Sequence, residues 1–141
     1  MFTSGVAEMI SIQTQLSVFL DNRPGTLART CQALAKEEIN ILALSISDTV
    51  DHAVVRMVVT DAKKAEQVLA KLHATVQGRD VILMSVPNQP GMLAKIAEKL
   101  AEAGVNIEYA YCTSSSGQEV GNMVLRTNDI EETVNMLSDT N

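Results

Sequence analysis

The sequence predicts an α+β fold made of two tandem copies of one βαββαβ unit, with antiparallel sheets that carry their helices on one face. Residues 22–41 and 88–107 are related by a constant offset of 66 and are identical at nine of twenty positions. Average composition would give about one or two identities by chance. Strand-like and helix-like patterns also follow in the same order in both copies. We therefore place the first unit at residues 10–78 and the second at residues 79–141.

Each copy starts with a strand that leads through a Pro-Gly pair into a helix. The strands are residues 15–21 and 81–86, which are rich in Val, Leu and Ile. Pro24 and Pro90 suit the first helical position, where a missing N–H costs nothing. Apolar residues at helical spacing then predict the faces that pack on the sheet. These faces are Leu27, Cys31, Leu34 and Ala35 in the first helix and Leu93, Ile96, Ala97 and Leu100 in the second.

The end of the second copy's helix predicts an unusual backbone conformation in the first copy. Gly104 stands where a left-handed residue is expected after a helix, and its counterpart is Glu38. We therefore expect Glu38 to have a positive φ angle.

The rest of each copy reads as a β-hairpin followed by a second helix. The hairpin strands are residues 39–47 and 53–59 in the first copy and residues 105–113 and 121–126 in the second. The second helices are residues 62–72 and 129–137, the latter with Asn128 and Glu131 spaced as a capping box.

The two copies differ at their ends. The first finishes with a short strand near residues 75–77, before Gly78 turns into the second copy, whereas no residues remain for a fourth strand in the second copy. The second unit should therefore lack its last strand, which leaves a sheet edge open. We expect residues 6–11 or a second chain to cover it.

Composition argues against several classes of function. The net charge is −6 with scattered basic residues, and aromatic residues make up 3%, which disfavours nucleic acid and anionic membranes as partners. No signal peptide or membrane-spanning stretch is expected, so we expect a cytoplasmic protein. Cys31 and Cys112 form no CxxC pair, which predicts no metal site, and one long-range disulfide stays open. His52 and His73 have no nearby nucleophile, so neither catalytic residues nor a cofactor is expected.

The repeated Asn-x-Pro-Gly junction is the element that carries binding chemistry. Gly25 and Gly91 precede helix N-termini, where unpaired N–H groups and a partial positive charge favour a carboxylate. A side-chain amide can both donate and accept, as a zwitterionic amino acid requires. Such amides lie beside the junctions at Asn22 and Asn88 and on the following strands at Asn40 and Asn106. The alternative interpretation is structural, with these Asn residues as turn formers or caps.

The chain resembles the ACT domain, specifically the stand-alone tandem ACT proteins that are described as amino-acid binding. The resemblance covers about residues 10–137 and is carried by QLSVFLDNRPGTL, INILALSISDT, VVRMVVTDAKKAEQVL and VPNQPGMLAKIAEKLAEAGVNIEYAY. It implies a ferredoxin-like fold whose units pair side by side, a homodimer, and an amino acid bound where units meet.

By this resemblance, the loop of each copy faces the second-strand Asn of the other. One site would join Asn22, Gly25 and Thr26 with Asn106, and the other Asn88, Gly91 and Met92 with Asn40. The full predicted ligand-binding set is Asn22, Arg23, Gly25, Thr26, Leu27, Asn40, Asn88, Gly91, Met92, Leu93 and Asn106.

The identity of the amino acid is less strongly indicated. Leu20 and Val86 replace a His of some serine-sensing members, which argues against serine. Tyr109 and Tyr111 project to one face near Asn106, so the first site and an apolar or aromatic amino acid are favoured.

Three other functions compete with a free-standing sensor. The chain could be the regulatory small subunit of an amino-acid biosynthetic enzyme of the acetolactate-synthase type. It could be an acylphosphatase-like enzyme on the same fold, with Arg23 and Asn40 in the anion site, although the second copy has Gln89. It could also be a dimerisation module that binds nothing.

Overall fold

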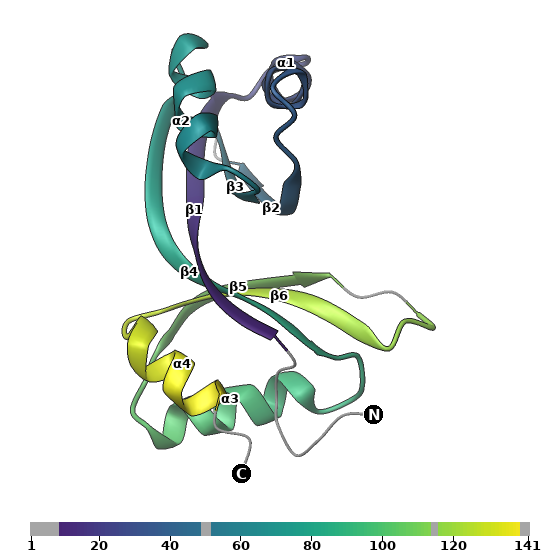
Figure 1. Ribbon diagram of the computed structural model, residues 1–141, viewed down its shortest axis with the longest axis vertical. Coiled ribbons are helices and arrows are strands. Elements are labelled where there is room, and N and C mark those ends of the chain that lie inside the picture. Colours follow the sequence, from purple (N-terminus) through teal and green to yellow (C-terminus); the bar gives the residue numbers. More distant parts are fainter. Residues whose placement is uncertain (1–8, 49–51, 114–115, 139–141) are drawn as a thin grey trace. The chain divides into compact units, whose positions relative to one another are not determined.

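The computed structural model describes residues 9–48, 52–113 and 116–138. It contains six strands and four helices within those residues (Figure 1). In chain order these are β1 (Met9–Asp21), α1 (Thr26–Lys36), β2 (Ile41–Asp48), β3 (His52–Val59), α2 (Ala62–Lys71), β4 (Thr75–Pro87), α3 (Met92–Glu102), β5 (Ile107–Thr113), β6 (Val120–Thr127) and α4 (Ile130–Ser138). The order of strands and helices is the one that the repeat predicts, and the α+β fold with two tandem βαββαβ units is confirmed.

The chain forms two compact units, and their membership does not follow the repeat boundaries. The first-repeat unit is Thr14–Arg79, with the strand order β2-β3-β1-β4. The second-repeat unit combines residues 80–138 with residues 9–13, in the order β5-β6-β4-β1. Both hairpins are antiparallel, and so are the pairs β1–β3 and β4–β6. Each unit therefore has the four-strand order of a complete βαββαβ sheet.

Residues 9–13 fill the strand position that the second repeat lacks. They are the first part of β1, and Ile10 packs against the apolar core of the second-repeat unit. The strand thus supplies one of the two predicted covers for the open edge. The remainder of the predicted covering segment, residues 6–8, lies outside the described residues, as do parts of both predicted hairpin turns.

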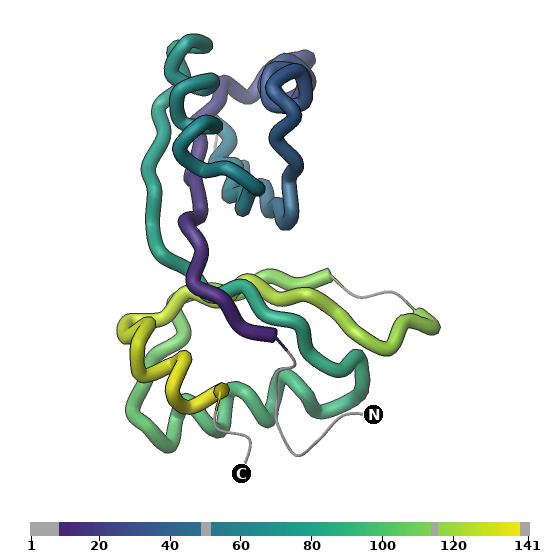
Figure 2. The backbone as a smooth tube through the Cα atoms, viewed as in Figure 1, coloured from purple at the N-terminus to yellow at the C-terminus, as the bar shows by residue number. Residues whose placement is uncertain are grey.

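Gly78 does not turn the chain, contrary to the prediction from sequence. It lies inside β4, which is one uninterrupted strand from Thr75 to Pro87. The backbone tube does not reverse its direction along this stretch (Figure 2). A Cβ atom at residue 78 would lie 3.2 Å from the Thr14 methyl carbon, so glycine here allows β4 and β1 to approach closely. The predicted short strand at residues 75–77 is therefore the beginning of the second repeat's first strand.

Each unit buries the apolar face of its sheet under two helices (Figure 1). In the first-repeat unit the alternate β1 residues Leu16, Val18 and Leu20 meet Leu34 of α1 and Leu69 of α2. The second-repeat unit repeats this pattern, with Ile82, Met84, Val86, Ile96, Leu100, Met123, Leu125 and Leu137. The helices accordingly lie on one face of each sheet, as the periodicity predicts.

The buried faces of the two loop helices agree with the predicted ones at Leu34, Ile96 and Leu100 but differ at their first positions. Leu93 is 55% exposed, whereas Met92, Ile96 and Leu100 are buried. In α1, Leu27 is 36% exposed and the buried residues are Thr30 and Leu34. The reason is that both helices begin after the glycine, so the first inward position falls on residue 26 or 92 rather than on the leucine that follows it.

The backbone at the helix ends agrees with one specific prediction. Glu38 has φ 59°, and its counterpart Gly104 has φ 72°. His73 also has φ 59°, at the end of α2, which the sequence analysis did not anticipate. Cys31 and Cys112 are free thiols.

Candidate functional site

The Pro-Gly pair of each repeat forms a tight turn before the helix. Gly25 has φ 90° and ψ −16°, and the Thr26 N–H donates to the Arg23 carbonyl at 3.3 Å. Gly91 has φ 87° and ψ −4°, and its turn is closed in the same way by residues 89 and 92. These angles are those of a type II turn, which favours Pro at its second position and requires a positive φ at its third. Pro24 and Pro90 therefore shape the turn and are not the first helical residues.

Both turns leave the following helix without a side-chain cap. Gly25 and Gly91 occupy the N-cap positions and provide no side-chain acceptor. In the described part of the chain, the amides at positions 25, 27 and 28 donate to no protein group, and the same holds for positions 91, 93 and 94. Such open N–H groups at the positive end of a helix attract a carboxylate.

The other two described helices, α2 and α4, do have side-chain caps at their N-termini, so among the described helices only those that follow the type II turns are uncapped. The Asp61 carboxylate accepts from the Lys64 N–H at 3.0 Å at the start of α2. Asp129 accepts from the Glu132 N–H at 3.0 Å at the start of α4. Asp129 and not Asn128 caps α4, so the predicted capping box of Asn128 and Glu131 is wrong.

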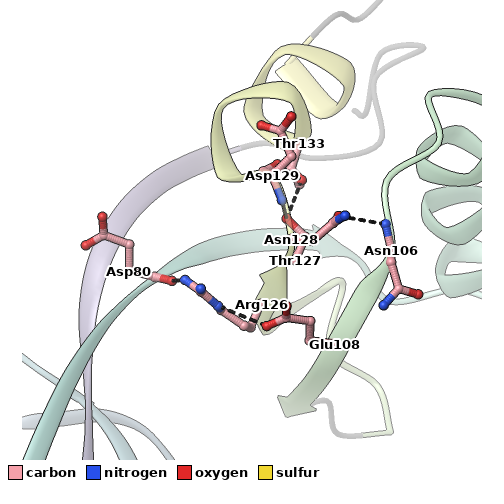
Figure 3. Close-up of polar contacts among 8 residues, drawn as sticks. All are labelled: Asp80, Asn106, Glu108, Arg126, Thr127, Asn128, Asp129 and Thr133. Atoms are coloured by element: carbon pink, nitrogen blue, oxygen red, sulfur yellow. Dashed lines mark hydrogen bonds and ion pairs between the residues drawn. The ribbon is translucent and has the colours of Figure 1, made fainter.

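Asn40 and Asn106 are held by their backbones and present their side chains to solvent. The Asn40 N–H donates to the Thr60 hydroxyl at 3.0 Å, and the Thr60 N–H donates back to the Asn40 carbonyl at 3.0 Å. Asn128 pairs with Asn106 in the equivalent way, at 2.9 and 3.2 Å (Figure 3). Both carboxamides are exposed and make no hydrogen bond within the described residues, so neither caps a helix.

The loop asparagines of the two repeats have different roles. The Asn88 carboxamide donates to the Gln118 carbonyl at 2.9 Å, and its backbone N–H donates to the Glu119 carbonyl at 2.8 Å. Asn88 thereby ties its loop to the segment before β6. The Asn22 side chain is exposed and has no hydrogen-bond partner in the described part of the chain. The structural interpretation therefore fits Asn88, while Asn22 keeps its carboxamide available for a ligand.

A cavity of about 270 Å³ lies beside α1 in the first-repeat unit. Arg23 and Thr26 of the predicted set line it, together with eight residues that sequence reasoning did not select. These eight are Phe19, Leu20, Asp21, Arg29, Thr30, Leu72, His73 and Ala74. A comparison of the two repeats could have indicated Thr30 as a candidate. Thr26 and Thr30 stand where the second repeat has the apolar residues Met92 and Ile96.

The second-repeat unit has a smaller and more apolar cavity of about 120 Å³ at its loop. Asn88, Met92 and Leu93 of the predicted set line it. The remaining lining residues are Val86, Pro87, Gln89, Cys112, Thr113, Gly121, Asn122 and Met123. Met92 is 8% exposed and belongs to the core, so it is mainly a packing residue.

The structure thus gathers the predicted residues by repeat. Asn22 and Gly25 of the first loop and Leu27 of α1 do not line the first cavity, and Gly91 of the second loop does not line the second. The predicted partners Asn106 and Asn40 belong to the opposite compact unit from the loop that each would face. Those cross-unit pairings therefore stay predictions.

No group of three or more His, Cys, Asp or Glu side chains is placed to hold a metal ion within the described part of the chain. None of the described helices is long and apolar enough to cross a membrane.

The two units, in each of which a type II turn joins a strand to an uncapped helix, define a tandem pair of ferredoxin-like domains. The family described as the ACT domain pair matches residues 10–141, and the chain belongs to this family. Among curated proteins, none matches the chain.

Solved structures agree with this assignment. Protein BT0572 from Bacteroides thetaiotaomicron is 37% identical, with a TM-score of 0.85, and the match covers 92% of this chain and 89% of that one. The ligand-free regulatory subunit of aspartate kinase from Thermus thermophilus is 15% identical, with a TM-score of 0.67, and covers 96% and 98% of the two chains. The corresponding subunit from Thermus flavus is 19% identical, with a TM-score of 0.58, over 96% and 98%. The last two similarities concern the fold.

Proposed function

We propose that this protein is a cytoplasmic amino-acid-sensing regulatory module without a catalytic site of its own. The observation that carries the proposal is the open N-terminus of α1, whose amides at Gly25, Leu27 and Ala28 have no acceptor in the described chain. A ligand carboxylate would accept from these amides, which also lie at the positive end of the helix. The free Asn22 carboxamide stands beside them.

The ammonium and side chain of the ligand would be held by the other unit. Asn106 has a fixed backbone and an available carboxamide, and Asn40 offers the same to the second loop. We prefer the loop of the first repeat, because Asn88 in the second already bonds to the Gln118 carbonyl. An amino acid with an apolar or aromatic side chain is the favoured ligand, with Tyr109 and Tyr111 as its wall.

A second candidate is the regulatory subunit of a larger enzyme of amino-acid metabolism. The solved regulatory subunits of aspartate kinase favour this candidate, because the structural match to this chain covers 98% of each of them. The acylphosphatase alternative gains no support, because the Arg23 guanidinium donates to the Asp21 carboxylate at 2.9 Å. Co-purification of a larger catalytic chain with the tagged protein would separate a subunit from a free-standing homodimeric sensor.

The sensing proposal is tested by thermal denaturation in the presence of each of the twenty amino acids. A ligand at 100 times its dissociation constant should raise the free energy of unfolding by about 2.7 kcal/mol. Asn22→Ala should reduce that gain without lowering the stability of the ligand-free protein, because its side chain bonds to no described residue. Asn135→Ala, at an exposed position of α4, is the matched control and should leave the gain unchanged. The absence of stabilisation by every amino acid would refute sensing.

A further inference from the structure

Two inward positions of α1 that line its cavity differ between the repeats. With the offset of 66, Thr26 corresponds to Met92 and Thr30 to Ile96. Met92 and Ile96 fill the second-repeat core, at 8% and 0% exposure. In the first repeat the two smaller threonines line the space of about 270 Å³. The lining includes the exposed side chains of Asp21 and Arg23, so the cavity is open to solvent and a ligand can reach it.

One of these threonines has an unmet hydrogen-bonding need. The Thr30 hydroxyl donates to the Thr26 carbonyl at 2.9 Å. The Thr26 hydroxyl oxygen, in contrast, is shielded from solvent and has no partner in the described structure. A buried polar atom without a hydrogen-bond partner lowers the stability of the folded protein by about 1–3 kcal/mol. A ligand that forms a hydrogen bond with this hydroxyl would remove that cost.

Positive charge is concentrated at the same place without compensation. The Arg29 guanidinium folds back toward the start of its own helix, with Nη1 3.4 Å from where a Cβ atom of residue 25 would lie. A cation at the positive end of a helix is unfavourable, and the first turn of α1 contains no acidic residue. Arg29 forms no ion pair with any described residue.

Among the described residues, the one carboxylate that lines the cavity, that of Asp21, does not neutralise the charge of Arg29. Asp21 pairs with Arg23 at 2.9 Å, and both side chains are mostly exposed, at 59% and 70%. The lining therefore keeps one unpaired guanidinium in a protein whose net charge is −6. An anion is the ligand that would satisfy both the charge and the hydroxyl.

We propose that this cavity binds the carboxylate or phosphate group of a small anionic metabolite, with Arg29 and Thr26 as its donors. The volume lies just below the range of about 300–1,000 Å³ that is usual for small-molecule sites, so the ligand is small. Phe19 and Leu72 would cover its apolar part. The site adjoins the loop site and shares Arg23 and Thr26 with the predicted set, whereas Asn22, Gly25 and Leu27 do not line the cavity.

The test is a titration of the full chain, labelled with ¹⁵N, with sodium phosphate and with sodium succinate at constant ionic strength. Saturable shifts of the Thr26 and Arg29 amide signals and of the Arg29 side-chain Nε signal are expected, with sodium chloride producing none. Tighter binding of phosphate would identify a phosphate-bearing ligand, and tighter binding of succinate a carboxylate. Failure of both probes to saturate these signals would overturn the proposal.

Matched variants decide whether the assigned donors do the binding. Arg29→Gln should weaken the bound probe about tenfold or more, the loss expected for one hydrogen bond between charged groups. Lys95→Gln changes the equivalent residue of the second repeat and should leave the affinity unchanged. Thr26→Val keeps the shape and should weaken binding severalfold. Equal affinities of the wild type and Arg29→Gln, or equal losses in Arg29→Gln and Lys95→Gln, would overturn the assignment. A protein that binds these anions but no amino acid would refute the proposed function alone.

Discussion

Replacement of Glu38 by glycine should stabilise the protein. Glu38 has φ 59° directly after α1, where its N–H donates to the Ala35 carbonyl at 3.0 Å and the Ile39 N–H donates to the Leu34 carbonyl at 3.0 Å. These bonds fix a left-handed helix end, which costs a residue with a Cβ atom about 1–2 kcal/mol. Glycine avoids that cost but loses about 0.4–1 kcal/mol through its freer unfolded chain. The expected net gain is about 0.5–1 kcal/mol.

Urea-induced unfolding followed by circular dichroism measures this change, and Glu38→Ala separates the backbone from the side chain. Alanine removes the exposed carboxylate but keeps the Cβ atom, so it should not reproduce the gain. Gly104→Ala is the reciprocal variant in the second repeat. A Cβ atom there would meet nothing within 4 Å, so its expected loss of about 1 kcal/mol reflects φ 72° alone. Equal stabilisation by Gly and Ala at residue 38 would refute the backbone argument.

Three further predictions concern the loops and helix starts, each measured as the free energy of unfolding in urea. Asn88→Ala should cost about 1 kcal/mol through loss of its bond to the Gln118 carbonyl, and an unchanged value would contradict the tie between loop and hairpin. Gly91→Ala should cost about 1–2 kcal/mol because φ is 87° while the Cβ position is open, and a gain would exclude the left-handed turn. Asp61→Ala should cost about 1 kcal/mol as a lost cap, which Asp61→Asn should largely retain; equal losses would argue against capping.

Much of the fold was predictable because local patterns and the repeat support each other. Alternating apolar residues locate the strands, and the Pro-Gly pairs locate the starts of α1 and α3 within two residues. The positive φ of Glu38 followed from Gly104, since equivalent positions of a duplicated unit share backbone conformation. These features depend on neighbours along the chain or on the second copy, which the sequence displays directly.

The features that were not predictable depend on distant partners. No local pattern shows that Gly78 lies against Thr14. None shows that Ile10 packs in the core of the second-repeat unit, whose main segment begins at residue 80. Leu34, Ile96 and Leu100 are buried as predicted, but Leu27 and Leu93 are not. The first inward residue is Thr26 or Met92, directly after the glycine N-cap. The distinction between Asn22 and Asn88 rests on one backbone carbonyl, that of Gln118, which belongs to a segment 30 residues away.

The reciprocal use of β1 and β4 has a consequence for dissecting the protein. A fragment cut at the repeat boundary would leave the C-terminal half without residues 9–13, the strand that completes its sheet. To obtain that half by itself, one would instead have to permute the gene, so that the codons of residues 9–13 follow those of α4. A gene duplication that copied the second repeat alone would meet the same restriction, because the copy would lack residues 9–13.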